Sequence, residues 1–260
     1  MLLLVDAGNT RVKWAVIDRS LANPVLGQWH ASGSVARADA AQLVEIWRTF
    51  KIGRVLLSNV AGHDMRDELE RAVLRALGTK PVALEWFASC EELGGVRSSY
   101  PNPTQLGCDR FASAIGAHAL FPNTPLIVAT CGTATTIEAI NPDGVFIGGM
   151  ILPGLGLMAT SLAKNTAQLP QVVLQTSLTQ PFADNTDAAI VSGCLAAQAG
   201  AIERAAAAHA KAHPDAPISC ILAGGAADLI APHLTIAHQR VDNLVLIGLQ
   251  TVATHASPPC

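Results

Sequence analysis

The chain has 260 residues, of which 50% are hydrophobic and only 14% charged, and its formal net charge is −3. This composition excludes an intrinsically disordered chain and suggests that much apolar surface is buried between domains or subunits. A chain of this length can form one large domain or two smaller ones. No cluster of basic residues stands out, so nucleic acid is not expected as a partner.

Two further features of the sequence bear on its location. The six cysteines are scattered and form no C-x-x-C pair, which argues against a structural zinc site and for a reducing compartment. The apolar start of the chain is interrupted by Asp6, so it is too short for a signal peptide or a membrane span. We therefore expect a cytoplasmic protein that does not associate with membranes.

The chain begins with a predicted β-hairpin. An apolar strand over residues 2–5 leads into a turn, and a second strand with alternating apolar residues starts at Thr10. Asp6, Asn9 and Lys13 surround the turn with a carboxylate, an amide and an ammonium group. One hypothesis is a polyphosphate site. The carboxylate would face Mg²⁺, and the hydroxyl of Thr10, the ammonium group and the backbone N–H groups would bind phosphate oxygens. The other is a buried hairpin whose polar residues only satisfy its turn.

Strands and helices then alternate, which is typical of an α/β domain. A charged helix face among them needs no function, because exposure to solvent accounts for it. The apolar pattern predicts strands over residues 27–31, 54–60 and 82–87 and helices over residues 39–50 and 63–77.

A polar loop over residues 91–105 contains Tyr100, the only tyrosine of the chain, and runs directly into a predicted helix. Asp109 and Arg110 stand near the start of that helix. An aspartate there is usually a cap, and an arginine there is usually solvated. The proline-containing segment 121–125 then predicts a domain boundary.

The second half of the chain repeats the opening pattern. A strand over residues 126–129, a turn with Gly132 and a strand over residues 134–140 follow one another as in the first hairpin. Gly132 follows Gly8 by about half the chain, and Gly8 is expected to adopt a positive φ in its turn. A duplication of this size predicts two similar domains that face each other across a cleft, each with a glycine turn.

The remaining elements carry weaker signals. His209 and His213 have the i,i+4 spacing of a metal-binding pair, but no third ligand stands nearby in the sequence. The pair Gly224-Gly225 would let a ligand such as adenosine approach the backbone closely. The pattern also predicts a strand over residues 145–147, a turn over 148–154 that starts a helix, a helix from 186 to 208 capped by Asn185 or Thr186, a strand over 219–223 and a final helix over 242–254.

Several common catalytic motifs are absent from the sequence. It contains no G-x-x-x-x-G-K-[ST], no G-x-S-x-G and no H-E-x-x-H segment. The first predicted strand is followed by another strand rather than by a helix, which argues against a Rossmann dinucleotide site.

A set of short motifs in a fixed order covers nearly the whole chain. Each motif alone is weak, but the ordered set resembles the type III pantothenate kinases, a branch of the superfamily of actin, heat-shock chaperone ATPases and sugar kinases. The motifs are Asp6-Ala7-Gly8-Asn9-Thr10 with Lys13, Tyr100 followed by Leu106-Gly107-Cys108-Asp109-Arg110, Gly132-Thr133-Ala134, Gly148-Gly149 with Pro153-Gly154, Thr166-Ala167-Gln168-Leu169-Pro170, Asn185-Thr186 with Gly193, and Gly224-Gly225.

The resemblance implies an α/β fold of two similar actin-like (ribonuclease H-like) domains with an ATP cleft between them. Residues 1–121 would carry the first phosphate hairpin and the substrate loop, and residues 122–260 the second phosphate hairpin and the adenosine-side glycine pair. It further implies ATP-dependent phosphorylation of pantothenate to 4′-phosphopantothenate, the first step of coenzyme A biosynthesis. Mg²⁺, a monovalent cation (K⁺ or NH₄⁺) and a homodimer with the active site at its interface belong to the same expectation.

The resemblance also implies roles for individual residues. Asp109 would be the general base, Arg110 would pair with the substrate carboxylate, and Asp6 would lie near Mg²⁺ through water. The expected ATP contacts are Asp6, Ala7, Gly8, Asn9, Thr10, Arg11, Val12, Lys13 and Thr133, and the expected pantothenate contacts are Tyr100, Gly107, Cys108, Asp109, Arg110 and Thr186.

The sequence departs from the family pattern at two positions. Thr130 stands where members commonly carry an aspartate associated with the monovalent cation, and Glu138 stands where a shorter aspartate is often found. Two other functions remain open: a non-catalytic accessory factor for gene expression, and a kinase or polyphosphate hydrolase with another substrate on the same scaffold. The loop with Tyr100 and residues 107–110 favours the pantothenate branch.

Overall fold

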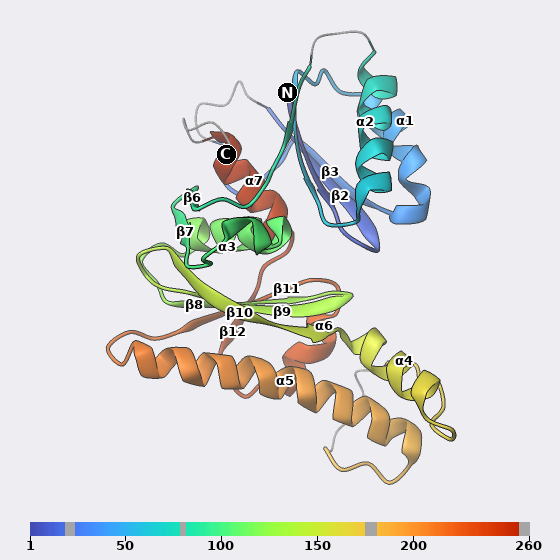
Figure 1. Cartoon of the computed structure of the whole chain (residues 1–260), viewed down its shortest axis with the longest axis vertical. Coiled ribbons are helices and arrows are strands. Elements are labelled where there is room, and N and C mark those ends of the chain that lie inside the picture. The colour runs from blue at the N-terminus through green and yellow to red at the C-terminus, as the bar shows by residue number, and fades with distance from the viewer. Residues whose placement is uncertain (19–23, 79–81, 175–180, 255–260) are drawn as a thin grey trace. The chain divides into compact units, whose positions relative to one another are not determined.

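The computed structural model describes residues 1–18, 24–78, 82–174 and 181–254. The chain forms two compact units, and Figure 1 labels many of their elements. The first comprises Met1–Phe121 together with Asn243–Cys260, and the second comprises Pro122–Asp242. The domain predicted over residues 122–260 is wrong for its last helix, because that helix packs in the first unit.

The first unit is built on a five-stranded sheet of order β3-β2-β1-β4-β5. Strand β1 is antiparallel to β2 and parallel to β4, and β4 is parallel to β5. The strands are β1 (Leu2–Ala7), β2 (Arg11–Ile17), β3 (Ala31–Ala36), β4 (Arg54–Asn59) and β5 (Ala83–Trp86). The other elements are η1 (Arg37–Gln42), α1 (Leu43–Arg48), α2 (His63–Leu77), the hairpin β6 (Glu92–Leu93) and β7 (Val96–Ser98), η2 (Pro103–Gln105), α3 (Cys108–Leu120) and α7 (Leu244–Thr254).

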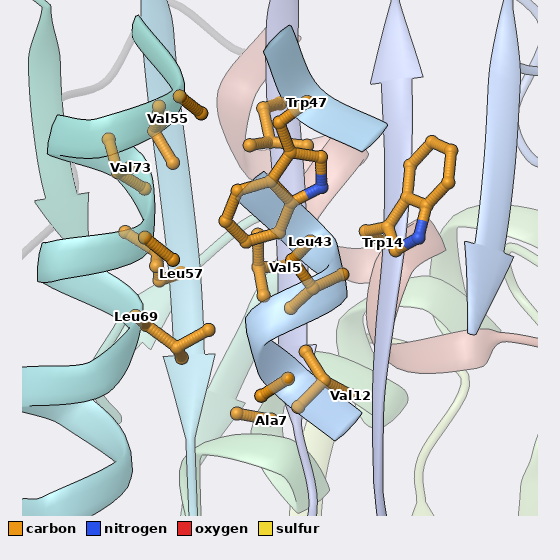
Figure 2. Packing of buried hydrophobic residues seen from close by; sticks show 14 of the residues in the cluster. Val5, Ala7, Val12, Trp14, Leu43, Trp47, Val55, Leu57, Leu69 and Val73 are labelled. Carbon is orange, nitrogen blue, oxygen red and sulfur yellow. The ribbon is translucent and has the colours of Figure 1, made fainter. Parts of the chain in front are cut away.

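Helices cover both faces of the β1–β4 region, which explains why β1 is almost continuously apolar. One face carries alternate residues such as Val5 and Leu57, which pack against Trp47 of α1 and Leu69 of α2 (Figure 2). The other face carries residues of the opposite parity, such as Leu4, and α7 contacts β1 while α3 contacts β4.

Helix α7 joins the first unit because it crosses α3 at very short range. A Cβ atom on Gly248 would lie 1.9 Å from the carbonyl oxygen of Ala112, and one on Gly116 would lie 2.5 Å from that of Leu244. Gln250 of the same helix accepts hydrogen bonds from Gly27 N at 3.1 Å and Trp29 Nε1 at 2.9 Å. These contacts bring the end of the chain back to its first unit.

The Gln250 contacts also account for an error in the predicted strands. Residues 27–31 were expected to form a strand, but β3 lies at Ala31–Ala36, because the residues before it form a turn bound by Gln250. The predicted helix over residues 39–50 is divided into η1 and α1. The helix predicted over residues 63–77 is confirmed as α2.

The second unit repeats the strand arrangement of the first. Its strands follow the order β12-β11-β8-β9-β10, with β8 antiparallel to β9 and parallel to β11, which corresponds strand for strand to β5-β4-β1-β2-β3. The predicted internal duplication is thereby confirmed. The strands are β8 (Leu126–Cys131), β9 (Ala134–Ile140), β10 (Val145–Pro153), β11 (Ser219–Ala223) and β12 (His238–Arg240).

Helices α4 and α5 pack on one face of the second sheet. Ile127 and Ile137 of the sheet belong to one buried cluster with Leu155 of α4 and Ile190 of α5. Asn185 caps α5, since its Oδ1 accepts a hydrogen bond from Ala188 N at 3.0 Å. The helices are α4 (Leu155–Asn165), α5 (Thr186–Ala212), α6 (Ala227–Ile230) and η3 (Ala231–His233).

Strand β10 is longer than predicted. Residues 148–154 were expected to form a turn, but all except the last of them continue β10. The strand pairs with β9 beyond a register shift between Phe146 and Gly148. This bulge accommodates the two glycines that suggested a turn.

The histidine pair near the end of α5 has structural partners. His209 Nε2 lies 3.1 Å from the carbonyl oxygen of Ile140, and His213 Nε2 lies 2.9 Å from Oδ1 of Asn141. The pair thus fastens α5 to the β9–β10 turn. Across the described ranges, no group of three or more His, Cys, Asp or Glu side chains is arranged to hold a metal ion.

Two further observations concern a cysteine and the lengths of the helices. Cys90 is disulfide-bonded, which the scattered spacing of the cysteines did not predict. Within the part of the chain that the structure describes, no helix is both long enough and apolar enough to cross a membrane.

The α3–α7 crossing predicts that Gly248→Ala destabilises the protein by about 2 kcal/mol or more, because a backbone carbonyl occupies the space of the new methyl group. The matched control is Gly200→Ala in α5, where nothing lies within 4 Å of the added Cβ. That variant should gain about 0.5–1 kcal/mol from helix propensity. Urea denaturation measures both values, and equal stability of the two variants would contradict the close crossing.

Candidate active site

Three polar residues form a row across the first sheet on the face opposite α1 and α2. Asp6 of β1 is the register partner of Lys13 on β2 and of Ser58 on β4. Direct partners on neighbouring strands point to the same side of a sheet, so these three side chains share one face. Asp6 and Lys13 are half-buried, and Ser58 is fully buried.

The β1–β2 turn presents polar groups to solvent beside this row. Asn9 and Thr10 are exposed, while Ala7 and Val12 are buried in the core. Gly8 N donates a hydrogen bond to the Arg11 carbonyl oxygen at 3.0 Å, and the φ of Gly8 is not positive, so that expectation was wrong. The turn closes through this backbone contact instead.

The Arg11 side chain points back to the sheet. Its Nε donates to Ser34 Oγ at 2.6 Å, and its Nη2 donates to the Ser34 carbonyl oxygen at 3.2 Å. These bonds fasten β2 to β3. The guanidinium of Arg11 therefore has a structural use in this unit, and so does the buried side chain of Val12.

The start of α3 holds the second acidic group of the first unit. Asp109 Oδ1 accepts a hydrogen bond from Arg110 N at 2.8 Å, so the carboxylate lies at the positive end of the helix dipole. A Cβ atom on Gly107 would lie 2.9 Å from that oxygen, so a larger residue there would displace the Asp109 carboxylate. The buried Arg110 donates from Nη1 to the Tyr100 hydroxyl at 3.3 Å.

The pKa values of both carboxyl groups are raised. Burial raises the pKa of Asp6 to about 7, the negative charge of Asp109 adds to this increase, and Lys13 opposes it. Burial also raises the pKa of Asp109, against the N–H and the positive charge of Arg110. A carboxyl group whose ionisation is opposed by burial and by a neighbouring negative charge is typical of a site that binds a cation or moves a proton.

Ser58 was not predicted as a site residue. Its Oγ lies 3.3 Å from Sγ of Cys108, the residue that precedes Asp109. A usable signal existed, because the carboxyl ends of parallel strands meet at one edge of a sheet and often border a site. The expected pantothenate contact Cys108 also turns its thiol toward the carbonyl oxygen of Asn59, at 3.5 Å.

The corresponding turn of the second unit is enclosed by its own backbone. A Cβ atom on Gly154 would lie 2.1 Å from the Gly132 carbonyl oxygen, and one on Gly224 would lie 2.3 Å from that of Cys131. Gly224 has a φ of +88° and lets its own backbone segment lie close to the backbone at Cys131. Its sequence had suggested the close approach of a ligand. Thr133 is exposed at the tip of this turn.

Thr186 lies apart from this turn, at the start of α5. It lines a cavity of about 650 Å³ within the second unit, together with apolar residues of α4 and α5 such as Met158 and Ile190. Thr133 and Thr186 thus belong to the second unit, while the other expected site residues belong to the first.

The two departures from the family pattern lie on one face of the second sheet. Thr130 is the register partner of Thr136, whose Oγ1 lies 3.2 Å from Oε2 of the buried Glu138. Thr130 Oγ1 is buried and has no hydrogen-bond partner within the described residues. A carboxylate and two hydroxyl groups therefore share this face.

Comparison with known proteins identifies the family. The sequence model of the type III pantothenate kinases matches residues 2–208. A protein named type III pantothenate kinase from Janthinobacterium sp. (strain Marseille) is 75% identical over 260 residues, covering 100% of both chains. The chain belongs to the type III pantothenate kinase family. Another member, from Herminiimonas arsenicoxydans, is 70% identical over 260 residues, again with 100% of both chains covered.

Solved structures support the same fold. A protein named as a Baf family transcriptional activator from Campylobacter jejuni has a TM-score of 0.55 at 17% identity, with 96% of each chain covered. A protein named as a 2-dehydro-3-deoxygalactonokinase from Sinorhizobium meliloti has a TM-score of 0.59 at 14% identity, with 97% of this chain and 98% of that chain covered. The α/β fold of two similar actin-like units, predicted from resemblance to the type III pantothenate kinases, is thus confirmed.

The raised pKa of Asp6 predicts a pH dependence that Asp6→Asn removes. A carboxyl whose pKa rises from 3.8 to about 7 holds its proton more tightly in the folded state. Its contribution to stability is present below about pH 4 and is lost as the pH rises toward 7. The difference in unfolding free energy between wild type and Asp6→Asn should therefore fall by up to about 1 kcal/mol per pH unit in that window.

Urea denaturation at several pH values, with divalent metal removed by a chelator, measures this difference. Asp143→Asn, a change in the β9–β10 turn, serves as the control for removal of an unrelated carboxyl group. A pH-independent difference between wild type and Asp6→Asn would contradict the raised pKa.

Proposed function

We propose that the chain phosphorylates pantothenate by means of Asp6 and Asp109, two carboxyl groups of its first unit. Family membership supplies the reaction, since type III pantothenate kinases are phosphotransferases that use ATP with Mg²⁺ in coenzyme A biosynthesis. The observation that carries the division of roles is the electrostatic coupling of Asp6 at the end of β1 with Asp109 at the start of α3. Each carboxyl group has surroundings suited to a different task.

Asp6 is proposed as the residue nearest Mg²⁺, through water. A divalent cation fits there because its positive charge would offset the burial and the repulsion by Asp109 that together raise the pKa of Asp6. The exposed Asn9 and Thr10 of the adjoining turn, its backbone N–H groups and Lys13 are proposed to contact the phosphates of ATP. Thr133, at the equivalent turn of the second unit, is proposed as a further ATP contact. Bound Mg²⁺ would neutralise the charge that develops on the phosphates.

Asp109 is proposed as the general base for the primary hydroxyl of pantothenate. Its raised pKa makes the carboxylate a stronger proton acceptor, and the hydrogen bond from Arg110 N fixes its orientation. Phosphoryl transfer through a loose transition state asks little of the base until the phosphoryl group has largely left ATP. The main task of Asp109 is therefore to hold the hydroxyl in line.

Arg110 and Tyr100 are proposed to recognise the carboxylate of pantothenate. The guanidinium is buried, so its attraction for an anion is screened less than at the surface. Its contact with the Tyr100 hydroxyl fixes one edge of the planar fork. Thr186 is proposed as a further contact of this substrate.

We also propose that the functional form is a homodimer. Large apolar side chains are exposed on β10 and α4, including Ile151 at 65% and Leu157 at 48% exposure. Such residues gathered on one unit are typical of a protein interface. Sedimentation equilibrium at micromolar concentration tests this, and a monomeric mass would reject it.

The decisive test of function is ATP consumption by the purified protein with Mg²⁺, in the presence and absence of pantothenate. Pantothenate-dependent turnover is expected. Turnover that appears only with another hydroxyl compound would show a different acceptor, and no turnover with any acceptor would favour an accessory role.

The base assignment predicts that Asp109→Asn lowers kcat by roughly 10²–10⁴, the range typical of a lost general base. The asparagine is similar in size and can still accept a hydrogen bond from Arg110 N, so the melting temperature should change little. Asp64→Asn, an exposed change in α2, is the matched control and should leave kcat unaltered. A folded Asp109→Asn enzyme with wild-type kcat would exclude this residue as the base.

For the monovalent cation, we propose that Glu138 supplies the negative charge that Thr130 lacks. Two observations support a cation at this place. The buried hydroxyl of Thr130 has no hydrogen-bond partner within the described residues, and the carboxylate of Glu138 lies on the same face of the sheet, next to Thr136. K⁺ should then stimulate ATP turnover over tetramethylammonium at equal ionic strength, and Glu138→Gln should remove that stimulation. The proposal fails if wild type shows no stimulation or if the variant keeps it.

A further inference from the structure

A hydroxyl–thiol contact lies directly beside the two proposed catalytic carboxyl groups. Ser58, fully buried near the end of β4, is the direct neighbour of Asp6 across the parallel β1–β4 pair. Its Oγ lies 3.3 Å from Sγ of Cys108, the first residue of α3. Asp109 is the next residue of that helix. One short contact therefore connects the strand position beside Asp6 to the helix position beside Asp109.

The strand side of this contact is held firmly. Asn59, which follows Ser58, accepts a hydrogen bond from Ala61 N at 2.8 Å and donates one to the Gly62 carbonyl oxygen at 2.9 Å. Val60 N donates to the carbonyl oxygen of Ala7, at 3.1 Å. The end of β4 is thus bonded both to itself and to the end of β1, so it can serve as a rigid support for α3.

The thiol of Cys108 donates one hydrogen bond and accepts another. Burial raises the pKa of Cys108 although its hydrogen bonds with Ser58 and Asn59 oppose this increase, and the nearby negative charges of Asp109 and Asp6 add to it, so the thiol keeps its proton. It donates that proton to the carbonyl oxygen of Asn59, 3.5 Å away, and accepts from the hydroxyl of Ser58. The hydroxyl and the thiol of this partly buried pair are both satisfied in this way.

We propose that Ser58 and Cys108 are positioning residues. Their contact fixes the first turn of α3 on the end of β4 and thereby fixes the position of Asp109 relative to Asp6. The proposal rests on the proposed function, because it takes Asp109 as the base and Asp6 as the group near Mg²⁺. Cys108 then acts through its neighbour, with its side chain directed to β4 rather than to substrate. A displacement of about 1 Å at a reacting group can cost 10²-fold in rate, so a small shift of α3 is sufficient to matter.

The test compares Ser58→Ala, Cys108→Ala and Cys108→Ser with Ser113→Ala. Ser113 is an equally buried hydroxyl on α3, one turn beyond Asp109, and serves as the matched control. Each full-length protein is assayed for pantothenate-dependent ATP turnover with Mg²⁺, and its melting temperature is measured in parallel. Ser58→Ala and Cys108→Ala should lower kcat roughly tenfold to a hundredfold and change KM for ATP less than about twofold.

Two further outcomes separate positioning from a merely structural role. Cys108→Ser keeps a donor and an acceptor at the same place and should recover much of the kcat lost in Cys108→Ala. The double variant Ser58→Ala/Cys108→Ala should be about as slow as the slower single variant, because the two side chains form one contact. Independent, multiplicative losses would overturn the proposal, as would a loss of kcat in Ser113→Ala of the same size.

The same assays distinguish a failure of the positioning role from a failure of the proposed function. Wild-type turnover that needs pantothenate and is strongly lowered in Asp109→Asn upholds the proposed function, whatever the result for Ser58→Ala. Folded Ser58→Ala and Cys108→Ala proteins with wild-type kcat would overturn the positioning role alone.

Discussion

The parallel pairing of β1 with β4 is the constraint on which the candidate site of the first unit depends. It brings the carboxyl ends of two buried strands to one edge of the sheet, so that Asp6 and Ser58 are direct neighbours. Helix α3 begins at that edge, where Cys108 forms hydrogen bonds with Ser58 and Asn59 of β4. Burial raises the pKa of Asp6, and the negative charge of the nearby Asp109 raises it further. A bound cation would stabilise the ionised form of Asp6 against both effects.

The duplicated architecture shows how one framework has been adapted twice. Asp6 and Thr130 occupy equivalent places, each two residues before the glycine of its turn on the first strand of its sheet. The first place carries a carboxylate with a raised pKa, whereas the second carries a neutral hydroxyl with Glu138 nearby on the same face. The backbone is equivalent, so the side chains alone decide which turn carries the acidic group.

Local patterns predicted much of this structure, and their failures have identifiable causes. Helix α2 and strands β9 and β11 were predicted at their observed limits, because their apolar periodicity agrees with their packing. Strand β3 was placed too early because Gln250, more than 200 positions away, binds the preceding turn. Gly8 was expected to have a positive φ, but the turn closes with a backbone hydrogen bond to Arg11.

The sequence by itself determined the α/β class, the internal duplication and the ordered motifs that identify the family, since all of these reside in local composition and spacing. Tertiary structure alone decided that α7 returns to the first unit, because only packing reveals that Gly116 and Gly248 let two helices cross without side chains between them. It also decided that Ser58 and Cys108 meet beside Asp6 and Asp109. No local pattern encodes such a contact, because it joins residues 50 positions apart through the pairing of strands.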